Sequence, residues 1–241
     1  MGEALNLFFQ YFSLPTLAVV VVGYLLGSIN FSIIVTNIYI RKDIRNFGSG
    51  NAGATNVLRS VGKVPALLTF AGDFAKQVAA ILIGRLIFTG MLPQAIDNLD
   101  ILLRYASYLA GISCFLGHIF PLFFRFRGGK GVTTAAAMML LIDWRVFLIE
   151  FAVFVIVMLC TRIVSLGSVI CGILYPVTTF LVAYFVDYRK VIHTSDAPYT
   201  LTYVIIATVF AALVGIIMVV KHRANIVRIL QGTEQPIRSK D

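Results

Sequence analysis

Long apolar stretches and short polar segments alternate along the whole chain. An α-helix needs about 20 apolar residues to cross the roughly 30 Å of hydrocarbon in a bilayer. Six stretches reach or approach that length, at residues 17–40, 64–88, 101–124, 147–161, 166–186 and 201–220, and a shorter one lies at 132–143. The pattern predicts an all-α, polytopic membrane protein with about seven transmembrane helices. Residues 1–234 form one predicted domain, and residues 235–241 a polar, disordered C-terminal tail.

Composition and charge support the membrane class and suggest an orientation. Apolar residues make up 59% of the chain and charged residues only 13%, against about a quarter in soluble proteins. Of the 20 Lys and Arg, fourteen lie in the segments at 41–63, 125–130 and 162 and from 221 onward, whereas only three lie on the opposite side, at 145, 189 and 190. Because basic loops stay in the cytoplasm, we expect the N-terminus outside and the C-terminus in the cytoplasm. That orientation requires an odd number of crossings, which agrees with seven.

The same composition argues against several classes of function. The net charge of +9 is divided among loops, which suits anionic lipid headgroups better than nucleic acid. Cys114, Cys160 and Cys171 are isolated in apolar stretches without C-x-x-C spacing, so we expect neither disulfides nor a metal site. No cofactor and no obligate protein partner are implied.

The first polar segment, GSGNAGATNVLR at residues 48–59, has the composition of an anion-binding loop. It matches G-x-G-x-x-G, but a membrane helix precedes it where a dinucleotide fold would need a strand, so that fold is rejected. Its glycines, including Gly50, allow backbone N–H groups to approach an anion, and Arg59 adds a guanidinium. Further side-chain donors follow in the segment: Ser49, Asn51, Thr55 and Asn56. This density of donors favours phosphate binding over a glycine-rich turn with a solvated Arg.

The second polar segment, RFRGGKGVTT at residues 125–134, combines glycines with a lysine. It is not a nucleotide-binding P-loop, because Phe124 occupies the position of the required first glycine. Gly128 and Gly129 precede Lys130, and a helix is expected to begin near Thr133. The segment is either an anion-binding nest at a helix N-terminus or a basic cytoplasmic turn.

The third polar segment, HRANIVR at residues 222–228, places His222, Asn225 and Arg228 three residues apart and so on one helical face. That face is either a lipid-headgroup anchor or the wall of a site. Ser165 and Ser168 begin another predicted span, where hydroxyls and a helix N-terminus could meet an anion.

Ionisable residues also occur within the predicted spans. Asp73 and Lys76 have helical spacing, and buried charges in a membrane suggest either function or an internal ion pair, with the ion pair favoured here. His118 lies near a cytoplasmic helix end, where an interfacial hydrogen-bonding role is favoured over catalysis. Gly23 and Gly27 form G-x-x-x-G, which predicts close helix packing.

Four segments in order resemble the acyl-phosphate:glycerol-3-phosphate acyltransferases of bacterial membranes, the PlsY family. They are GSGNAGATNVLR, GHIFPLFFRFRGGKGVTT at 117–134, TRIVSLGS at 161–168 and HRANIVRILQGTE at 222–234. The resemblance implies a seven-helix enzyme that transfers a fatty acyl group from acyl phosphate to the sn-1 hydroxyl of glycerol 3-phosphate. The products would be lysophosphatidic acid and phosphate, in the first acylation of phospholipid biosynthesis. Membrane lipids and the two substrates are the implied partners, and the chain departs from the family pattern at Asn30 and in GDFAKQ at 72–77.

The resemblance also assigns roles to individual residues. The positions implied to contact glycerol phosphate or the reacting centre are Ser49, Arg59, Lys130, His222 and Asn225. The positions implied to hold acyl phosphate or phosphate are Gly50, Asn51, Thr55, Asn56, Gly128, Gly129 and Ser165. No G-x-S-x-G segment occurs, and no histidine is followed by an acid at the fifth position. We therefore expect direct attack by the glycerol hydroxyl, with a substrate phosphate oxygen accepting the proton while Lys130 and Arg59 neutralise the leaving phosphate.

Two other classes of function use the same polar segments. A transporter or lipid-binding protein could hold a phosphorylated solute, and a structural subunit could hold anionic lipid. Transporters often show internal repeats and helices broken in mid-membrane. The sequence shows no repeat, and its polar segments lie between spans on one face, which favours an enzyme at the membrane surface.

Overall fold

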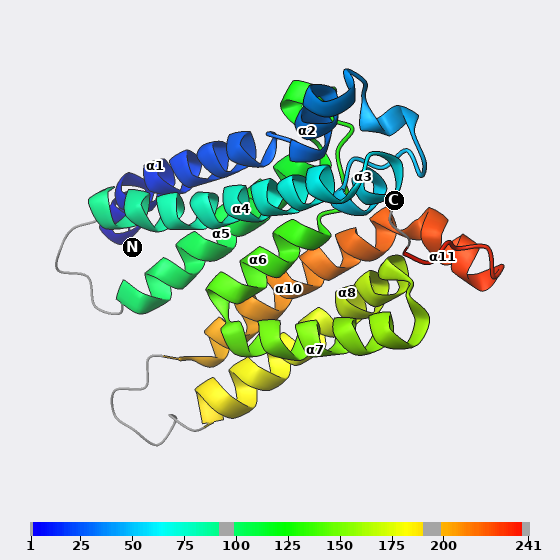
Figure 1. The fold of residues 1–241 in the computed structure, drawn as a ribbon. Coiled ribbons are helices and arrows are strands. Elements are labelled where there is room, and N and C mark those ends of the chain that lie inside the picture. Colours follow the sequence, from blue (N-terminus) through cyan, green and yellow to red (C-terminus); the bar gives the residue numbers. More distant parts are fainter. Residues whose placement is uncertain (1, 92–98, 190–198, 238–241) are drawn as a thin grey trace.

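The computed structural model describes residues 2–91, 99–189 and 199–237, and in these ranges the chain is all-helical (Figure 1). The segments at 92–98 and 190–198, each between two predicted spans, and the end of the predicted tail at 238–241 lie outside the described residues. The long helices are α1 (Gly2–Gly27), α4 (Lys63–Met91), α5 (Leu99–Ile119), α7 (Trp144–Thr161), α8 (Val164–Leu181) and α10 (Leu201–Lys221). The shorter helices are α2 (Phe31–Ile40), α3 (Ala54–Ser60), α6 (Val132–Ile142), α11 (Arg223–Leu230), η1 (Ile44–Asn46), η2 (Leu122–Phe124) and η3 (Val182–Tyr188).

The long helices form a bundle, and α2, α3 and α11 gather at one end of it together with the C-terminus (Figure 1). Within the described ranges, six helical segments are long and apolar enough to cross a membrane, and they coincide with the six predicted long spans. The shorter apolar helix Val132–Ile142 also forms where the sequence predicts a helix. The all-helical membrane class is therefore confirmed.

The first span differs from the expected continuous helix, because it breaks between α1 and α2. Asn30 caps α2, where its Oδ1 accepts hydrogen bonds from the Ile33 backbone N–H at 3.2 Å and from the Ser32 hydroxyl at 2.6 Å. An Asn side chain that bonds nearby backbone competes with helical hydrogen bonding and favours such a cap. The Ile29 carbonyl that the break frees accepts a hydrogen bond from Lys76 Nζ at 2.5 Å.

The predicted close packing at Gly23 and Gly27 is confirmed. Both glycines of α1 face α5, and a Cβ at Gly27 would lie 2.1 Å from the Cys114 carbonyl oxygen. Only a residue without a side chain allows the two backbones to approach this closely. The large buried side chains of α4, α5, α6, α8 and α10 form the apolar core beside this contact.

An ion-pair network joins α7 to the end of η3, at the end of the bundle away from α3 and α11. The Arg145 guanidinium donates to both carboxylate oxygens of Asp187, at 2.8 and 2.9 Å, and to those of Asp143 at 2.9 and 2.6 Å. A guanidinium that bridges two carboxylates in this way fixes their relative positions.

Residues 235–237, at the start of the predicted polar tail, form hydrogen bonds with two other parts of the chain. The Ile237 backbone N–H donates to the Arg162 carbonyl at 2.7 Å, and Arg59 Nη2 donates to the Gln235 carbonyl at 2.8 Å. These contacts join residues 235–237 to α3 and to the residue that follows α7.

Candidate active site

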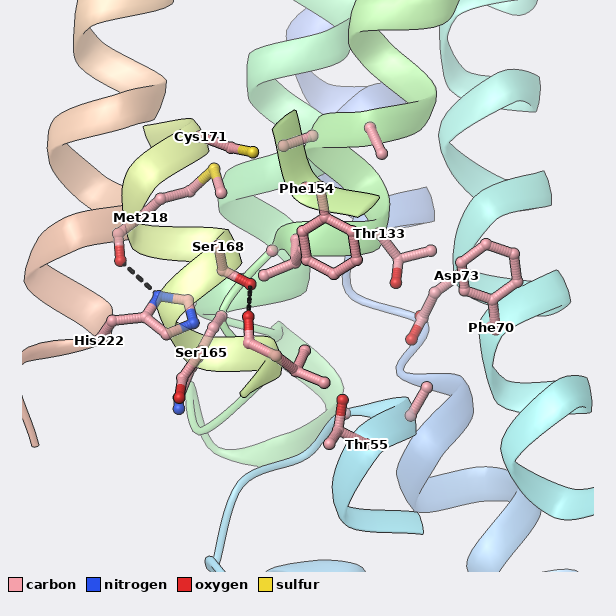
Figure 2. A pocket seen from close by; sticks show the side chains of 18 of the residues that line it. Thr55, Phe70, Asp73, Thr133, Phe154, Ser165, Ser168, Cys171, Met218 and His222 are labelled. Atoms are coloured by element: carbon pink, nitrogen blue, oxygen red, sulfur yellow. Dashed lines mark hydrogen bonds between the residues drawn. The ribbon is translucent and has the colours of Figure 1, made fainter. Parts of the chain in front are cut away.

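A cavity of about 410 Å³ lies where the three polar segments meet the bundle. Figure 2 shows Phe70 and Asp73 of α4 on one side of it, and Ser165, Met218 and His222 on the other. Its wall is polar toward the end that carries α3 and α11 and apolar toward the middle of the bundle. Nine of the predicted site residues line it: Ser49, Asn51, Thr55, Asn56, Arg59, Lys130, Ser165, His222 and Asn225. Gly50, Gly128 and Gly129 belong to the adjoining loops but do not line the cavity.

The first polar segment is a loop held in shape by Asn56. This side chain is buried, and its Nδ2 donates to the carbonyls of Phe47 at 2.9 Å and Asn51 at 3.0 Å. Its Oδ1 accepts a hydrogen bond from the Ser49 backbone N–H at 3.1 Å. Gly50 has a positive φ of 70°, which glycine adopts without strain. Asn56 therefore shapes the loop that carries Ser49, Asn51 and Thr55.

Arg59 on α3 lies between this loop and the C-terminal segment. Its Nη2 donates to the carbonyl oxygens of Gln235 at 2.8 Å and Pro236 at 3.4 Å. Because Arg59 also lines the cavity, these contacts place a guanidinium and residues 235–237 beside the same opening.

The second polar segment packs against the end of α5 and leads into α6. The backbone N–H groups of Gly128 and Gly129 donate to the carbonyls of Ile119 and His118, each at 3.2 Å. Gly131 caps α6 with a φ of 83° and lines the cavity, as does Thr133 in the first turn. The N-terminus of an eleven-residue helix therefore opens on the cavity beside Lys130.

A hydrogen-bonded network joins the second and third polar segments. Lys130 Nζ donates to Asn225 Oδ1, and Asn225 Nδ2 donates to Glu234 Oε1 at 2.7 Å. The same carboxylate accepts hydrogen bonds from the Ser165 hydroxyl at 2.7 Å and from Arg228 Nε at 2.6 Å. Glu234 also lines the cavity but was given no role from the sequence, because it lies in the polar end of the chain and shares no helical face with Asn225.

Two titratable groups of this network, Lys130 and Glu234, have shifted pKa values. Burial lowers the pKa of Lys130 from 10.5 to about 8, and the positive charges of Arg228 and Arg59 contribute, although Glu234 opposes the change. Burial would raise the pKa of Glu234, but its hydrogen bonds outweigh burial and hold that pKa below the ordinary value.

His222 is neutral at physiological pH and has a defined tautomer. Burial and the nearby Lys130 charge lower its pKa from 6.5 to about 4. Its Nδ1 lies 2.7 Å from the Met218 carbonyl oxygen, which can only accept, so Nδ1 carries the proton (Figure 2). The Nε2 nitrogen is therefore a hydrogen-bond acceptor on a residue of the cavity wall.

The predicted internal ion pair of Asp73 and Lys76 is confirmed, at 2.7 Å between Asp73 Oδ1 and Lys76 Nζ. His118 joins this pair, since its Nδ1 lies 3.0 Å from Lys76 Nζ. Asp73 and His118 also line the cavity.

Aromatic side chains of α4 and α7 form the apolar part of the wall. Phe70 and Phe74 come from α4, and Phe151 and Phe154 from α7. Phe70 and Phe151 are also about half exposed on the outer surface of the bundle, so the cavity wall is continuous with a lipid-facing surface.

Glu150 is, with Glu234, a second carboxylate of the wall that was not predicted from the sequence, because it lies within an apolar run. Its Oε1 accepts a hydrogen bond from the Thr178 hydroxyl at 2.7 Å.

The known proteins that resemble this chain share one description, glycerol-3-phosphate acyltransferase. The profile of the family described as glycerol-3-phosphate acyltransferase matches residues 17–232. A glycerol-3-phosphate acyltransferase of Brucella anthropi is 35% identical over 95% of this chain and 97% of its own length. The enzyme of that name from Clostridioides difficile is 39% identical over 92% of this chain and 95% of its own.

Two crystal structures share the fold. PlsY (YgiH), an integral membrane glycerol 3-phosphate acyltransferase, matches in its glycerol 3-phosphate form with a TM-score of 0.70 and 32% identity, over 92% of this chain and 96% of that chain. Its lysophosphatidic acid form matches with a TM-score of 0.68 and 30% identity, over 92% and 94%. The family profile and these relatives span nearly the whole chain, including all three polar segments. The chain therefore belongs to the PlsY family of integral membrane glycerol-3-phosphate acyltransferases.

Proposed function

We propose that this protein transfers a fatty acyl group from acyl phosphate to the sn-1 hydroxyl of glycerol 3-phosphate, releasing lysophosphatidic acid and phosphate in the first acylation of phospholipid biosynthesis. One observation supports the proposal: a cavity joins a polar end, lined by basic and hydroxyl side chains, to an apolar wall that is continuous with the lipid-facing surface. Acyl phosphate has a charged head and a long chain, and glycerol 3-phosphate has a second phosphate. The cavity offers a suitable environment for each part.

We assign the polar end of the cavity to the two phosphate groups. Arg59 and Lys130 supply positive charge, and the N-terminus of α6 adds the positive end of a helix dipole. Ser49, Asn51 and Thr55 supply side-chain donors from one loop, while Gly50, Asn56, Gly128 and Gly129 set the backbone of the two loops. Ser165 completes the wall on the opposite side. Charged hydrogen bonds to a phosphate are the strong ones, so these residues would determine substrate affinity.

His222 and Asn225 are placed to orient the attacking hydroxyl. His222 has an acceptor at Nε2, and its low pKa makes it a weak base, so it suits orientation of the hydroxyl better than full proton removal. Asn225 holds Lys130 through its Oδ1.

In the proposed step the glycerol oxygen bonds to the acyl carbon, the bond from that carbon to the phosphate oxygen breaks, and the hydroxyl proton passes to a phosphate oxygen.

Charge neutralisation then accounts for most of the expected catalysis. As phosphate leaves, negative charge grows on its oxygens, and Lys130 and Arg59 are fixed beside them. No covalent enzyme intermediate is required, because phosphate is already a good leaving group and binding in one cavity brings the two reactants together.

We further propose seven crossings, with α6 as the seventh, and the cavity on the cytoplasmic side of the inner membrane. The excess of basic residues in the segments that surround the cavity supports this orientation. Residues 1–234 would act as one domain. Labelling of single cysteines introduced at Lys42 and Trp144, in intact cells and in inverted vesicles, would test which end of the bundle faces the cytoplasm.

The activity is tested by incubating purified protein with palmitoyl phosphate and radiolabelled glycerol 3-phosphate, with palmitoyl-coenzyme A as a parallel donor. We expect labelled lysophosphatidic acid acylated at sn-1 from palmitoyl phosphate and none from the thioester. Uptake of labelled glycerol 3-phosphate into sealed vesicles without any product would contradict the proposal and favour a transporter.

A further inference from the structure

Three titratable side chains lie together beside the cavity and have no part in the mechanism above. Asp73 and Lys76 come from α4 and His118 from the end of α5, with side-chain exposures of 3%, 3% and 5%. Charges buried this deeply are costly unless they are paired and hydrogen-bonded. The three therefore form one unit, and two of its members, Asp73 and His118, line the cavity.

The contacts of Lys76 fix the tautomer of His118. Lys76 Nζ forms an ion pair with Asp73 Oδ1 at 2.7 Å, donates a hydrogen bond to the Ile29 carbonyl at 2.5 Å and lies 3.0 Å from His118 Nδ1. An ammonium group can only donate, so Nδ1 must accept. The distance from Nδ1 to Asp73 Oδ1, 3.4 Å, is longer than an ordinary N–H···O hydrogen bond. In neutral His118 the proton therefore lies on Nε2.

The Nε2 edge of His118 lies against the glycine loop that precedes α6. A Cβ at Gly129 would be 2.3 Å from Nε2, so the ring and the loop backbone are in direct contact. The His118 carbonyl also accepts the Gly129 N–H at 3.2 Å. Since Nδ1 faces Lys76, Nε2 is the nitrogen left for the cavity, and among the described residues it has no hydrogen-bond partner.

We propose that His118 is a further substrate-binding residue, whose Nε2–H donates a hydrogen bond to a phosphate oxygen of a substrate held between the glycine loop and Lys130. Lys76, held by Asp73 and the Ile29 carbonyl, is the positioning residue that keeps the proton on Nε2. This inference rests on the proposed function, because it needs a phosphate group in this cavity. The glycine at position 129 leaves room for the ring, because a Cβ there would lie 2.3 Å from Nε2.

The kinetic test compares His118→Phe, which keeps a ring without a donor, with His118→Gln, whose amide offers a donor near the position of Nε2. Thr69→Val is the matched control, because Thr69 is buried on α4 one turn before Asp73 and does not line the cavity. We expect His118→Phe to raise one KM about tenfold or more, His118→Gln to recover much of the loss, and Thr69→Val to leave both KM values unchanged.

The two substrates are the two possible sources of the phosphate. A rise in the KM of palmitoyl phosphate alone assigns the hydrogen bond to the acyl donor, and a rise in that of glycerol 3-phosphate alone assigns it to the acceptor. If His118→Phe lowers only thermal stability while both KM values stay at the wild-type level, the proposal is wrong and His118 only packs against the loop. Absence of acyl transfer by the wild-type protein would instead overturn the proposed function.

A spectroscopic measurement tests the tautomer without any turnover. Histidine labelled with ¹⁵N distinguishes a protonated ring nitrogen from an unprotonated one, and the spectrum of His118→Phe identifies the signals that belong to His118. We expect the Nε2–H tautomer, with an Nε2 shift that changes when inorganic phosphate is added. The paired variant Asp73→Asn/Lys76→Met removes both charges together, so it avoids an unpaired buried acid, and we expect it to lose the single tautomer. An Nδ1–H tautomer in the wild type, or no response to phosphate, would overturn the proposal.

Discussion

The pKa of Lys130 leads to a specific pH dependence of activity. The ammonium form is the one that can neutralise a leaving phosphate, and the cavity lowers its pKa from 10.5 to about 8. At about 1.4 kcal/mol per pKa unit, this depression means that the empty cavity disfavours the charged form by about 3 kcal/mol. The charged form predominates below pH 8 and is lost above it.

The expected result is an alkaline limb in kcat/KM, which reports the free enzyme. The value should be nearly level around pH 7, halve near pH 8 and then fall about tenfold per pH unit. Starting at pH 6.5 keeps the measurement above the second ionisation of a phosphate monoester, near pH 6. Initial rates of phosphate release from palmitoyl phosphate, at low glycerol 3-phosphate, supply the profile.

Two variants show whether the limb belongs to Lys130. Glu234 raises the pKa of Lys130 by its negative charge, so Glu234→Gln should move the limb to lower pH. Lys130→Arg carries a charge that persists across this range, so its residual activity should show no limb below pH 10. A wild-type profile that is flat from pH 7 to 10, or a limb that stays in Lys130→Arg, would refute the assignment.

Further substitutions test the packing, the loop geometry and the absence of a covalent intermediate. Gly27→Ala should lower the free energy of unfolding in detergent by about 1–3 kcal/mol, because its Cβ would lie 2.1 Å from a carbonyl oxygen of α5. The control Gly90→Ala, with open space at Cβ, should have little effect. Equal stabilities of the two variants would contradict the close packing of α1 against α5. Gly131→Ala should reduce kcat/KM, because the φ of 83° disfavours a side chain and a new Cβ would lie 2.2 Å from the Phe115 ring. If the variant has the same kcat/KM as the wild type, the loop conformation does not affect activity. Ser165→Ala should weaken but not abolish turnover, and mass spectrometry of the wild-type protein with palmitoyl phosphate should show no acyl adduct; an acyl-Ser165 species would mean that the reaction is covalent.

The helices could be predicted from the sequence because a membrane span needs a long apolar run, and that requirement is visible without tertiary information. The break after α1 could not be predicted from the sequence, where Asn30 and Ser32 are polar residues in an apolar run. Their effect on the helix depends on the hydrogen bond between them and on Lys76 of another helix, which donates to the Ile29 carbonyl. The pairing of Asp73 with Lys76 was predictable because both residues lie on one helix at a fixed spacing.

The candidate site was predictable only in part, because some of its contacts depend on how distant parts of the chain fold together. Loop residues such as Ser49 and Lys130 stand in glycine-rich polar segments that contrast with their apolar surroundings. Glu234 joins Ser165, Asn225 and Arg228 through contacts that depend on how the end of the chain folds back, and no periodicity in the sequence marks them.

Acyl transfer in this cavity is tested most directly by the stoichiometry of a reaction mixture that contains palmitoyl phosphate, glycerol 3-phosphate and either wild-type protein or Lys130→Met. We expect the wild-type protein to release one phosphate for each lysophosphatidic acid formed, and only when glycerol 3-phosphate is present. Both products should disappear in the folded variant. Phosphate release without lysophosphatidic acid, or undiminished synthesis by Lys130→Met, would contradict the assignment of acyl transfer to this cavity.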